Sequence, residues 1–115
     1  MEQRKFTRIN IVSSVDIYSI NEKMICKGVI TNISAGGVGI IAAESLEVGT
    51  DVKLSFKANK ELSFDNIKGI VVRTELIGNQ YFAFIGVNFL NVDPEKKTEL
   101  GKLIMEKRNE QQSFR

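Results

Sequence analysis

Residues 9–19 read Ile-Asn-Ile-Val-Ser-Ser-Val-Asp-Ile-Tyr-Ser, and this stretch decides the fold class. Apolar side chains recur at every second position, with one interruption by serine, at Ile9, Ile11, Val15 and Ile17. Successive side chains of a β-strand point to opposite faces, so this spacing predicts a strand with one face against a core.

Five further segments after this strand have strand composition and are separated by short turns. The segments are 24–31, 38–41, 52–57, 62–77 and 81–90. Polar residues and glycines mark the turns, most clearly at Gly78-Asn79, which is typical of a hairpin. Six short strands predict a mainly β fold, a small antiparallel barrel or sandwich, in which Cys26 and the phenylalanines of 82–89 belong to the core.

The last segment has the pattern of a helix. Asp93 can cap its first turn, Pro94 suits its first position, and Glu95 suits the positive end of the helix dipole. One face is apolar, with Leu100, Leu103 and Ile104 at helical spacing. We predict a helix from about Pro94 to Lys107 that packs on the end of the sheet, followed by a polar tail that frays.

Composition excludes several classes of function. The 115 residues contain no His, no Trp and one Cys, so Ser-His-Asp and Cys-His catalytic sites and zinc sites of the usual ligand type are excluded. No carboxylate stands in a recognisable active-site setting, so we expect no enzyme, no metal and no cofactor. The single thiol suits a reducing compartment.

The formal charge of +2 is unevenly distributed along the chain. Residues 1–8 and 95–115 each carry +2, whereas residues 9–94 carry −2. A duplex-DNA binder, or an OB-type barrel that binds single strands, usually has a broad basic face, so neither is favoured. No apolar stretch reaches the roughly 20 residues of a membrane helix, and the N-terminus lacks a signal-peptide pattern, so we expect a cytoplasmic protein without membrane insertion.

Two short motifs combine basic and polar residues. The first is Arg4-Lys5-Phe6-Thr7-Arg8, just before the first strand, and the second is Asn32-Ile33-Ser34-Ala35-Gly36-Gly37 between two strands. Taken singly, the arginines could be solvated charges, and the second motif could simply be good turn chemistry, in which Gly-Gly permits positive φ.

The order of these motifs resembles the PilZ domain family, whose signature is Arg-x-x-x-Arg followed by Asp/Asn-x-Ser-x-x-Gly. Residues 85–89, Ile-Gly-Val-Asn-Phe, and residues 48–52, Val-Gly-Thr-Asp-Val, also resemble family segments. The resemblance implies a six-stranded antiparallel PilZ-type (split) β-barrel with a C-terminal α-helix over residues 9–108. Residues 1–8 would form a flexible arm and residues 109–115 a polar tail.

The resemblance further implies a receptor for cyclic di-GMP, the bacterial second messenger, with arginines that bind the ligand from the arm. Arg4 and Arg8 can grip phosphate oxygens or a guanine edge with paired hydrogen bonds, whereas Lys5 offers only a point charge. The arm would be disordered without ligand and would become ordered on binding.

The same resemblance places the barrel side of the ligand site at the turn between two strands. Asn32 and Ser34 would meet a guanine edge or the sugar-phosphate backbone, and Gly36 and Gly37 would let main-chain groups approach closely. Arg73 is a weaker candidate, because it could extend over the same face or pair with an acidic neighbour. Two functions stay open: a receptor that signals to an unidentified protein effector, and an adaptor that binds no nucleotide. The oligomeric state also stays open.

Overall fold

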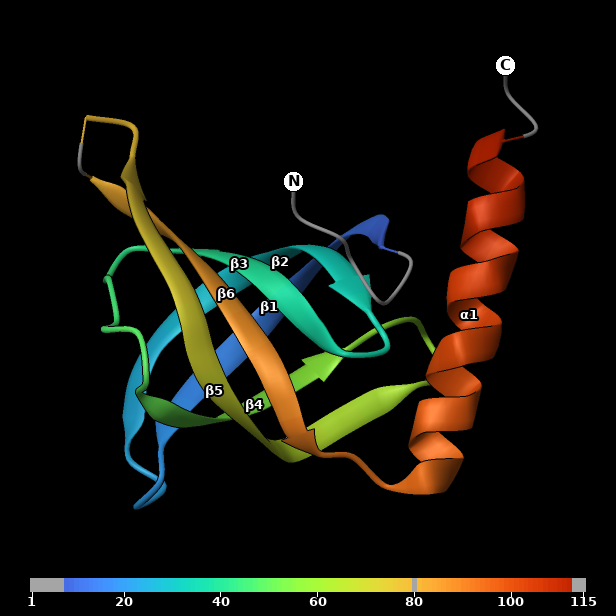
Figure 1. The fold of residues 1–115 in the computed structure, drawn as a ribbon, viewed down its shortest axis with the longest axis horizontal. Helices are drawn as coiled ribbons and strands as arrows, with labels where there is room; N and C mark the ends of the chain where they lie inside the picture. The colour runs from blue at the N-terminus through green and yellow to red at the C-terminus, as the bar shows by residue number, and fades with distance from the viewer. Residues whose placement is uncertain (1–7, 80, 113–115) are drawn as a thin grey trace.

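The computed structural model of the chain describes residues 8–79 and 81–112. Within these residues six strands close into an antiparallel barrel, and one helix follows the last strand (Figure 1). The predicted fold class, a mainly β antiparallel barrel with a C-terminal helix, is therefore confirmed. Arg4 and Lys5 of the predicted arm lie outside the described residues.

The barrel has the strand order β1-β2-β3-β6-β5-β4, and β4 pairs with β1 to close it. The elements are β1 Ile9–Ser19, β2 Met24–Ser34, β3 Gly37–Ala42, β4 Asp51–Lys57, β5 Ser63–Ile77, β6 Phe82–Asn91 and α1 Pro94–Gln112. Strands that are consecutive in the sequence are neighbours in the barrel except for β3 and β4, which β6 and β5 separate. In the β3–β4 connection the Gly49 N–H donates to the Val71 carbonyl at 2.7 Å.

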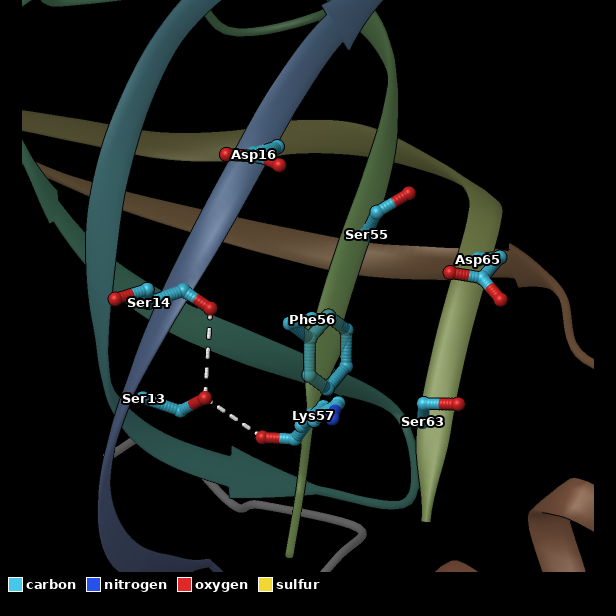
Figure 2. Close-up of a pocket in the computed structure, with 8 residues that line it drawn as sticks. All are labelled: Ser13, Ser14, Asp16, Ser55, Phe56, Lys57, Ser63 and Asp65. Atoms are coloured by element: carbon cyan, nitrogen blue, oxygen red, sulfur yellow. Dashed lines mark hydrogen bonds between the residues drawn. The ribbon is translucent and has the colours of Figure 1, made fainter. Parts of the chain in front are cut away.

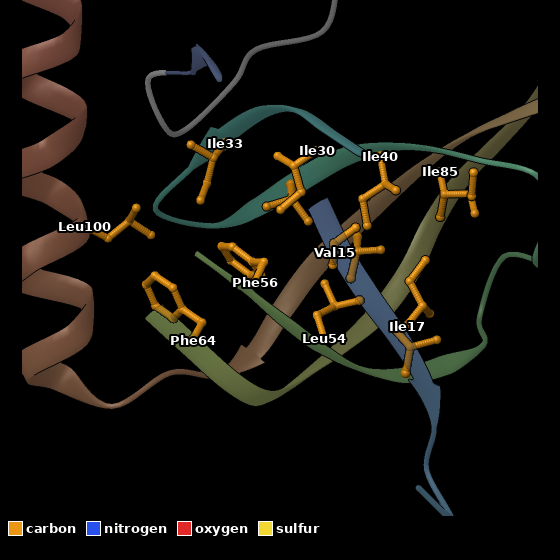
Figure 3. Packing of buried hydrophobic residues seen from close by; sticks show 14 of the residues in the cluster. Val15, Ile17, Ile30, Ile33, Ile40, Leu54, Phe56, Phe64, Ile85 and Leu100 are labelled. Atoms are coloured by element: carbon orange, nitrogen blue, oxygen red, sulfur yellow. The ribbon is translucent and has the colours of Figure 1, made fainter. Parts of the chain in front are cut away.

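Apolar side chains fill the inside of the barrel, as Figure 3 shows. In β4 the inward residues Val52, Leu54 and Phe56 are buried and alternate with polar residues. The ring of Phe56 stacks on that of Phe64 with centroids 5.0 Å apart, and both stack with Phe89. Because each inward residue is followed by an outward one, the polar side chains of these strands are left on the outer surface.

Helix α1 closes one end of the barrel and contacts β1 and β2. Asp93 caps it as predicted: its Oδ1 accepts the Glu95 N–H at 3.0 Å. The helix continues past the predicted end at Lys107 to Gln112, because the intervening residues include no Gly or Pro to stop it. The first part of the predicted tail is therefore helical. No helix in the described part of the chain has the length and apolar character needed to cross a membrane.

The structure corrects two local predictions. Strands β2 and β3 extend into the predicted loop over 31–37 and leave only two residues between them. Gly36 and Gly37 do not use the positive φ that glycine permits, whereas the hairpin turn at Gly78-Asn79 is confirmed, with φ of +58° at both residues. Phe82 is 50% exposed rather than part of the core, because the β5–β6 hairpin projects beyond the barrel (Figure 1).

Candidate functional site

The turn between β2 and β3 is shaped by the hydroxyl of Ser34. Its Oγ accepts the Gly36 N–H at 3.2 Å and donates to the Gly37 carbonyl at 3.4 Å. Ser34 is 5% exposed and is the only buried polar side chain among the described residues. The serine of the second motif therefore satisfies the backbone of its own turn, as short hydroxyl side chains often do.

The glycines of this turn are fixed against β6. A Cβ on Gly37 would lie only 2.1 Å from the Val87 carbonyl oxygen, so no other residue fits without moving the backbone. The Gly36 carbonyl accepts the Phe89 N–H at 2.8 Å. Glycine is thus required at position 37 by the close approach of two strands and not by its conformational freedom.

Asn32 and Arg8 bring the two sequence motifs together. The Arg8 Nη1 donates to the Asn32 Oδ1 at 3.0 Å, although the residues are 24 positions apart. The pairing of β1 with β2 explains the contact, because it sets Ile9 opposite Ile33 immediately beside it. The Asn32 Nδ2, on the other side of the same amide, donates to the Thr31 Oγ1 at 3.4 Å.

A row of residues crosses the outer surface of the barrel from Asn32. The pairing registers set Asn32 opposite Gly39, Gly39 opposite Gly86, and Gly86 opposite Arg73. A Cβ on Gly39 would lie 2.6 Å from the Asn32 Nδ2 and 2.9 Å from the Phe84 ring, so both side chains lean over this glycine. The two glycines therefore form a low floor between the Asn32 side and the Arg73 side, and the Asn32 and Phe84 side chains cover this floor at Gly39.

Arg73 lies on the same outer face but is held by its neighbours. Its Nη2 lies 2.9 Å from the Glu75 Oε2, and its guanidinium lies 5.3 Å from the centre of the Phe84 ring. Both alternatives raised from the sequence are thus present, since Arg73 faces this surface and also pairs with an acidic neighbour.

Sequence reasoning did not single out the two glycines of this surface. A signal was available: Gly39 and Gly86 each stand between two β-branched residues of a strand. If the β-branched neighbours point inward, the glycine faces outward and leaves room there for side chains from neighbouring strands. Phe84 was assigned to the core, but it is only half-buried and contributes to this outer face.

Other sites that could carry chemistry are weak in the described residues. Burial raises the pKa of the Cys26 thiol above its ordinary value, and the negative charge of Glu44 adds to this shift. The thiol is therefore protonated and poorly nucleophilic at neutral pH, and it packs against the core as predicted. Within residues 8–79 and 81–112, no group of three or more His, Cys, Asp and Glu side chains could hold a metal ion.

A depression of about 610 Å³ lies on another part of the surface, over β1, β4 and β5 (Figure 2). It forms where β1 and β4 part beyond the Val15–Phe56 pair, and the Ser13 Oγ spans the gap to the Lys57 carbonyl at 2.6 Å. Its lining includes two carboxylates and one lysine. None of the residues predicted for the site lies there, and its charge does not suit an anion.

Comparisons with known structures agree with this architecture. The inhibitor of motility MotI/DgrA of Bacillus subtilis matches 96% of the chain with a TM-score of 0.80 at 18% identity. YcgR of Escherichia coli in complex with c-di-GMP matches 97% with a TM-score of 0.78 at 17% identity, and the K. pneumonia MrkH–c-di-GMP complex matches 100% with a TM-score of 0.82 at 13% identity. At such identities these likenesses show the fold.

The chain spans about half the length of these three proteins, 53%, 49% and 57% respectively. A comparison with curated protein sequences gives no match. The model of the PilZ domain matches residues 2–106, which include both motifs, the whole barrel and most of the helix. The chain therefore belongs to the PilZ domain family.

Proposed function

We propose that this chain is a receptor for cyclic di-GMP that binds its ligand on the outer surface of the barrel, at Arg8 and Asn32. The 3.0 Å hydrogen bond between these two side chains carries the proposal, because it joins the two halves of the family signature in space. Family membership supports it, as do two structural neighbours, YcgR and MrkH, whose structures contain c-di-GMP.

The chemistry of the ligand fits these residues. Cyclic di-GMP has two anionic phosphates and two guanines, and an arginine fork can bind either a phosphate or the O6 and N7 atoms of guanine. In the proposal Arg8 and Arg4 supply two such forks, Lys5 adds an auxiliary charge, and Asn32 meets a guanine edge from the barrel. Residues 1–8 form the arm that becomes ordered over the ligand.

The turn contributes shape in this proposal. Ser34, Gly36 and Gly37 hold the strand ends that present Asn32, and the predicted contacts of these three residues with the ligand stay a prediction. Arg73 is a secondary ligand residue, because it faces the same surface but must first leave Glu75. An exposed ion pair of this kind is worth about 1 kcal/mol or less, so a phosphate can compete for the arginine.

Signal output follows from the ordering of the arm. The bound arm presents a new surface, and an effector protein that favours this surface shifts the population toward the bound state. Motility, biofilm or exopolysaccharide control is the kind of output we propose, and the name of MotI, inhibitor of motility, supports the first of these. The chain acts here as a receptor and not as an enzyme.

A second function is an adaptor that binds no nucleotide and acts only through protein contacts. One observation favours it: the Asn32 Oδ1 and the Ser34 hydroxyl already have partners without a ligand. A receptor must exchange at least the Arg8–Asn32 contact for ligand contacts, whereas an adaptor keeps it.

Calorimetric titration with cyclic di-GMP separates the two functions. We expect binding at micromolar concentrations or tighter, and a loss of about ten- to hundredfold in affinity for Arg8→Ala, as for other hydrogen bonds to charged groups. Arg8→Lys should restore little if the fork matters. Lys27→Ala, which removes an exposed charge on β2, is the matched control and should bind normally. Absence of binding by the unaltered chain at micromolar concentrations would refute the receptor and leave the adaptor.

Cyclic di-AMP serves as the ligand control, because it has the same two phosphates with different bases. If Asn32 meets a guanine edge, cyclic di-AMP binds much more weakly. Equal affinity for the two ligands would contradict recognition of the guanine base, and the chain would then be a receptor that recognises the phosphates alone.

A further inference from the structure

Strand β5 is longer than the strand that pairs with its outer side. Strand β4 pairs with β5 only as far as Ile70, and the β3–β4 connection adds two hydrogen bonds to Val71. Beyond this point residues 73–77 pair with β6 alone in the described part of the chain, and Val72 is the extra residue of a bulge. The backbone edge of residues 72–77 on the side away from β6 is therefore open. Figure 1 shows this end of β5 rising out of the barrel with β6.

The open edge carries large apolar side chains as well as charges. Val72 is 45% exposed and Leu76 is 54% exposed, and the three residues between them are also exposed. Proteins usually protect such an edge, because unpaired N–H and C=O groups flanked by apolar side chains are a template for another strand. In β5 the edge has neither a proline nor a covering element among the described residues.

The sequence of this edge is complementary to itself. Residues 72–76 read Val-Arg-Thr-Glu-Leu, with an apolar residue at each end and opposite charges on either side of Thr74. Two such strands that run antiparallel about a two-fold axis at Thr74 set Arg73 of each opposite Glu75 of the other. Val72 adds no facing pair to this register, because it is the extra residue of a bulge in β5. Opposite charges at directly facing positions stabilise an antiparallel pair.

We propose that this open edge of β5 pairs with the same edge of a second copy of the chain, in an antiparallel two-fold dimer centred on Thr74. A symmetric interface of this type needs one self-complementary patch, which residues 73–75 supply. The two hairpins then continue one sheet across the interface.

Other registers of the same edge are less favourable. A shift of one residue sets Arg73 opposite Leu76, and a shift of two sets Glu75 opposite Glu75 or Arg73 opposite Arg73. Like charges that face each other directly destabilise a strand pair. The charges therefore select the register centred on Thr74. Within each chain Arg73 and Glu75 form an ion pair at 2.9 Å. In the dimer the two such pairs lie side by side, so that each charge has an opposite charge as its neighbour both within its own chain and across the interface.

The dimer is weak by this argument. An edge of six residues buries less than the roughly 800 Å² per partner of a standard interface, so we expect dissociation constants in the high micromolar to millimolar range. Both side chains of the ion pair are more than half exposed, so salt screens the charges and shifts the equilibrium toward monomers.

Sedimentation velocity without nucleotide tests the proposal, with concentrations up to about 1 mM chosen to span this affinity range. The unaltered chain should shift from a mass of 12.9 kDa toward twice that value, and added salt should reverse the shift. Arg73→Glu makes the edge entirely acidic and Glu75→Arg makes it entirely basic, so each variant alone should stay monomeric. Lys27→Glu, a charge reversal on β2 outside the edge, should dimerise normally.

Mixing the two edge variants gives the decisive result. An acidic edge and a basic edge restore attraction at every facing position, so an equimolar mixture should form dimers although neither component does. This recovery also shows that both variants are folded. A mixture that stays monomeric, an unaltered chain that is monomeric at about 1 mM, single variants that dimerise normally, or a loss of dimers in Lys27→Glu would each overturn the proposal.

Discussion

Replacing Gly37 by alanine tests whether this motif glycine serves packing rather than ligand contact. The added Cβ would lie 2.1 Å from the Val87 carbonyl oxygen and 3.1 Å from the Asn88 Cα. Carbon–oxygen contacts in sheets are normally about 3.3 Å or longer, so the new atom is short of room by about 1.2 Å. The obstacle is backbone, which cannot swing aside as a side chain can.

The cost follows from the movement that relieves this clash. If β3 moves about 1 Å from β6, hydrogen bonds of about 2.9 Å lengthen beyond useful range. Losing two such bonds costs about 1–3 kcal/mol, and strain from overpacking adds about 1–3 kcal/mol. The free energy of unfolding should therefore fall by about 2–6 kcal/mol, out of the 5–15 kcal/mol that is usual for a domain.

Urea unfolding followed by far-UV circular dichroism measures this loss, since the chain has no Trp. With a typical urea slope of about 1–3 kcal/mol per molar, the midpoint of Gly37→Ala should fall by about 1 M or more. Gly101→Ala in α1 is the matched control. Beyond the backbone of α1 itself, no atom lies within 4 Å of its added Cβ, so it should raise stability by up to about 1 kcal/mol through helix propensity.

Two results would refute the reasoning about Gly37. If Gly37→Ala unfolds at the midpoint of the unaltered chain, the close approach of β3 and β6 does not constrain position 37. If it also loses cyclic di-GMP binding while keeping full stability, the glycine acts on the ligand directly, and its role in packing is wrong.

Three further predictions concern the site and the thiol. Gly39→Ala places a methyl group against the Asn32 amide and the Phe84 ring, which can both move aside, so stability should fall by only about 1 kcal/mol. Calorimetry should show weaker cyclic di-GMP binding, because Asn32 is displaced. An unchanged affinity would mean that the surface at Gly39 is not part of the ligand site. Asn32→Asp should bind cyclic di-GMP more tightly, because a carboxylate accepts stronger hydrogen bonds from guanine N–H groups and from Arg8 than an amide does. A drop in affinity would contradict the proposed contact between residue 32 and the guanine edge. Because its pKa is raised, Cys26 should react with iodoacetamide at pH 8 more slowly in the folded chain than in the urea-unfolded chain. The alkylation rate of the folded chain should also keep rising with pH after that of the unfolded chain has levelled off. Identical pH profiles for the two states would argue against the raised pKa.

Local patterns in the sequence were sufficient to predict the strands and the start of the helix. Alternation over residues 9–19 gives the bounds of β1, and the Asp93-Pro94 pair marks the first turn of α1. The region 31–37 was predicted as a loop from its Asn, Ser and Gly content, but pairing with β1 and β6 extends both strands into it. Tertiary pairing here overrides local preference, as is common for strands.

The candidate site was predictable only in part. The Arg8–Asn32 contact joins residues that the family motifs already single out. The Arg73–Phe84 contact depends on the register of β5 against β6, which shifts at a bulge between Val71 and Arg73. The sequence has no local mark of that extra residue, because a bulge is set by how two strands pair. Which outer residues face each other across the barrel could therefore not be predicted.

Asn32 and Ile33 are neighbours in β2 and point to opposite faces, so that Ile33 lies in the core while Asn32 faces outward. This arrangement lets evolution act on binding and on folding almost independently. A lineage can exchange Asn32 for another polar residue, and so gain, tune or abandon a ligand, while the barrel stays intact. Gly37 is the exception, since the fold itself constrains it. In a diverged descendant that has ceased to bind nucleotide, the glycine should thus outlast the arginines and the asparagine.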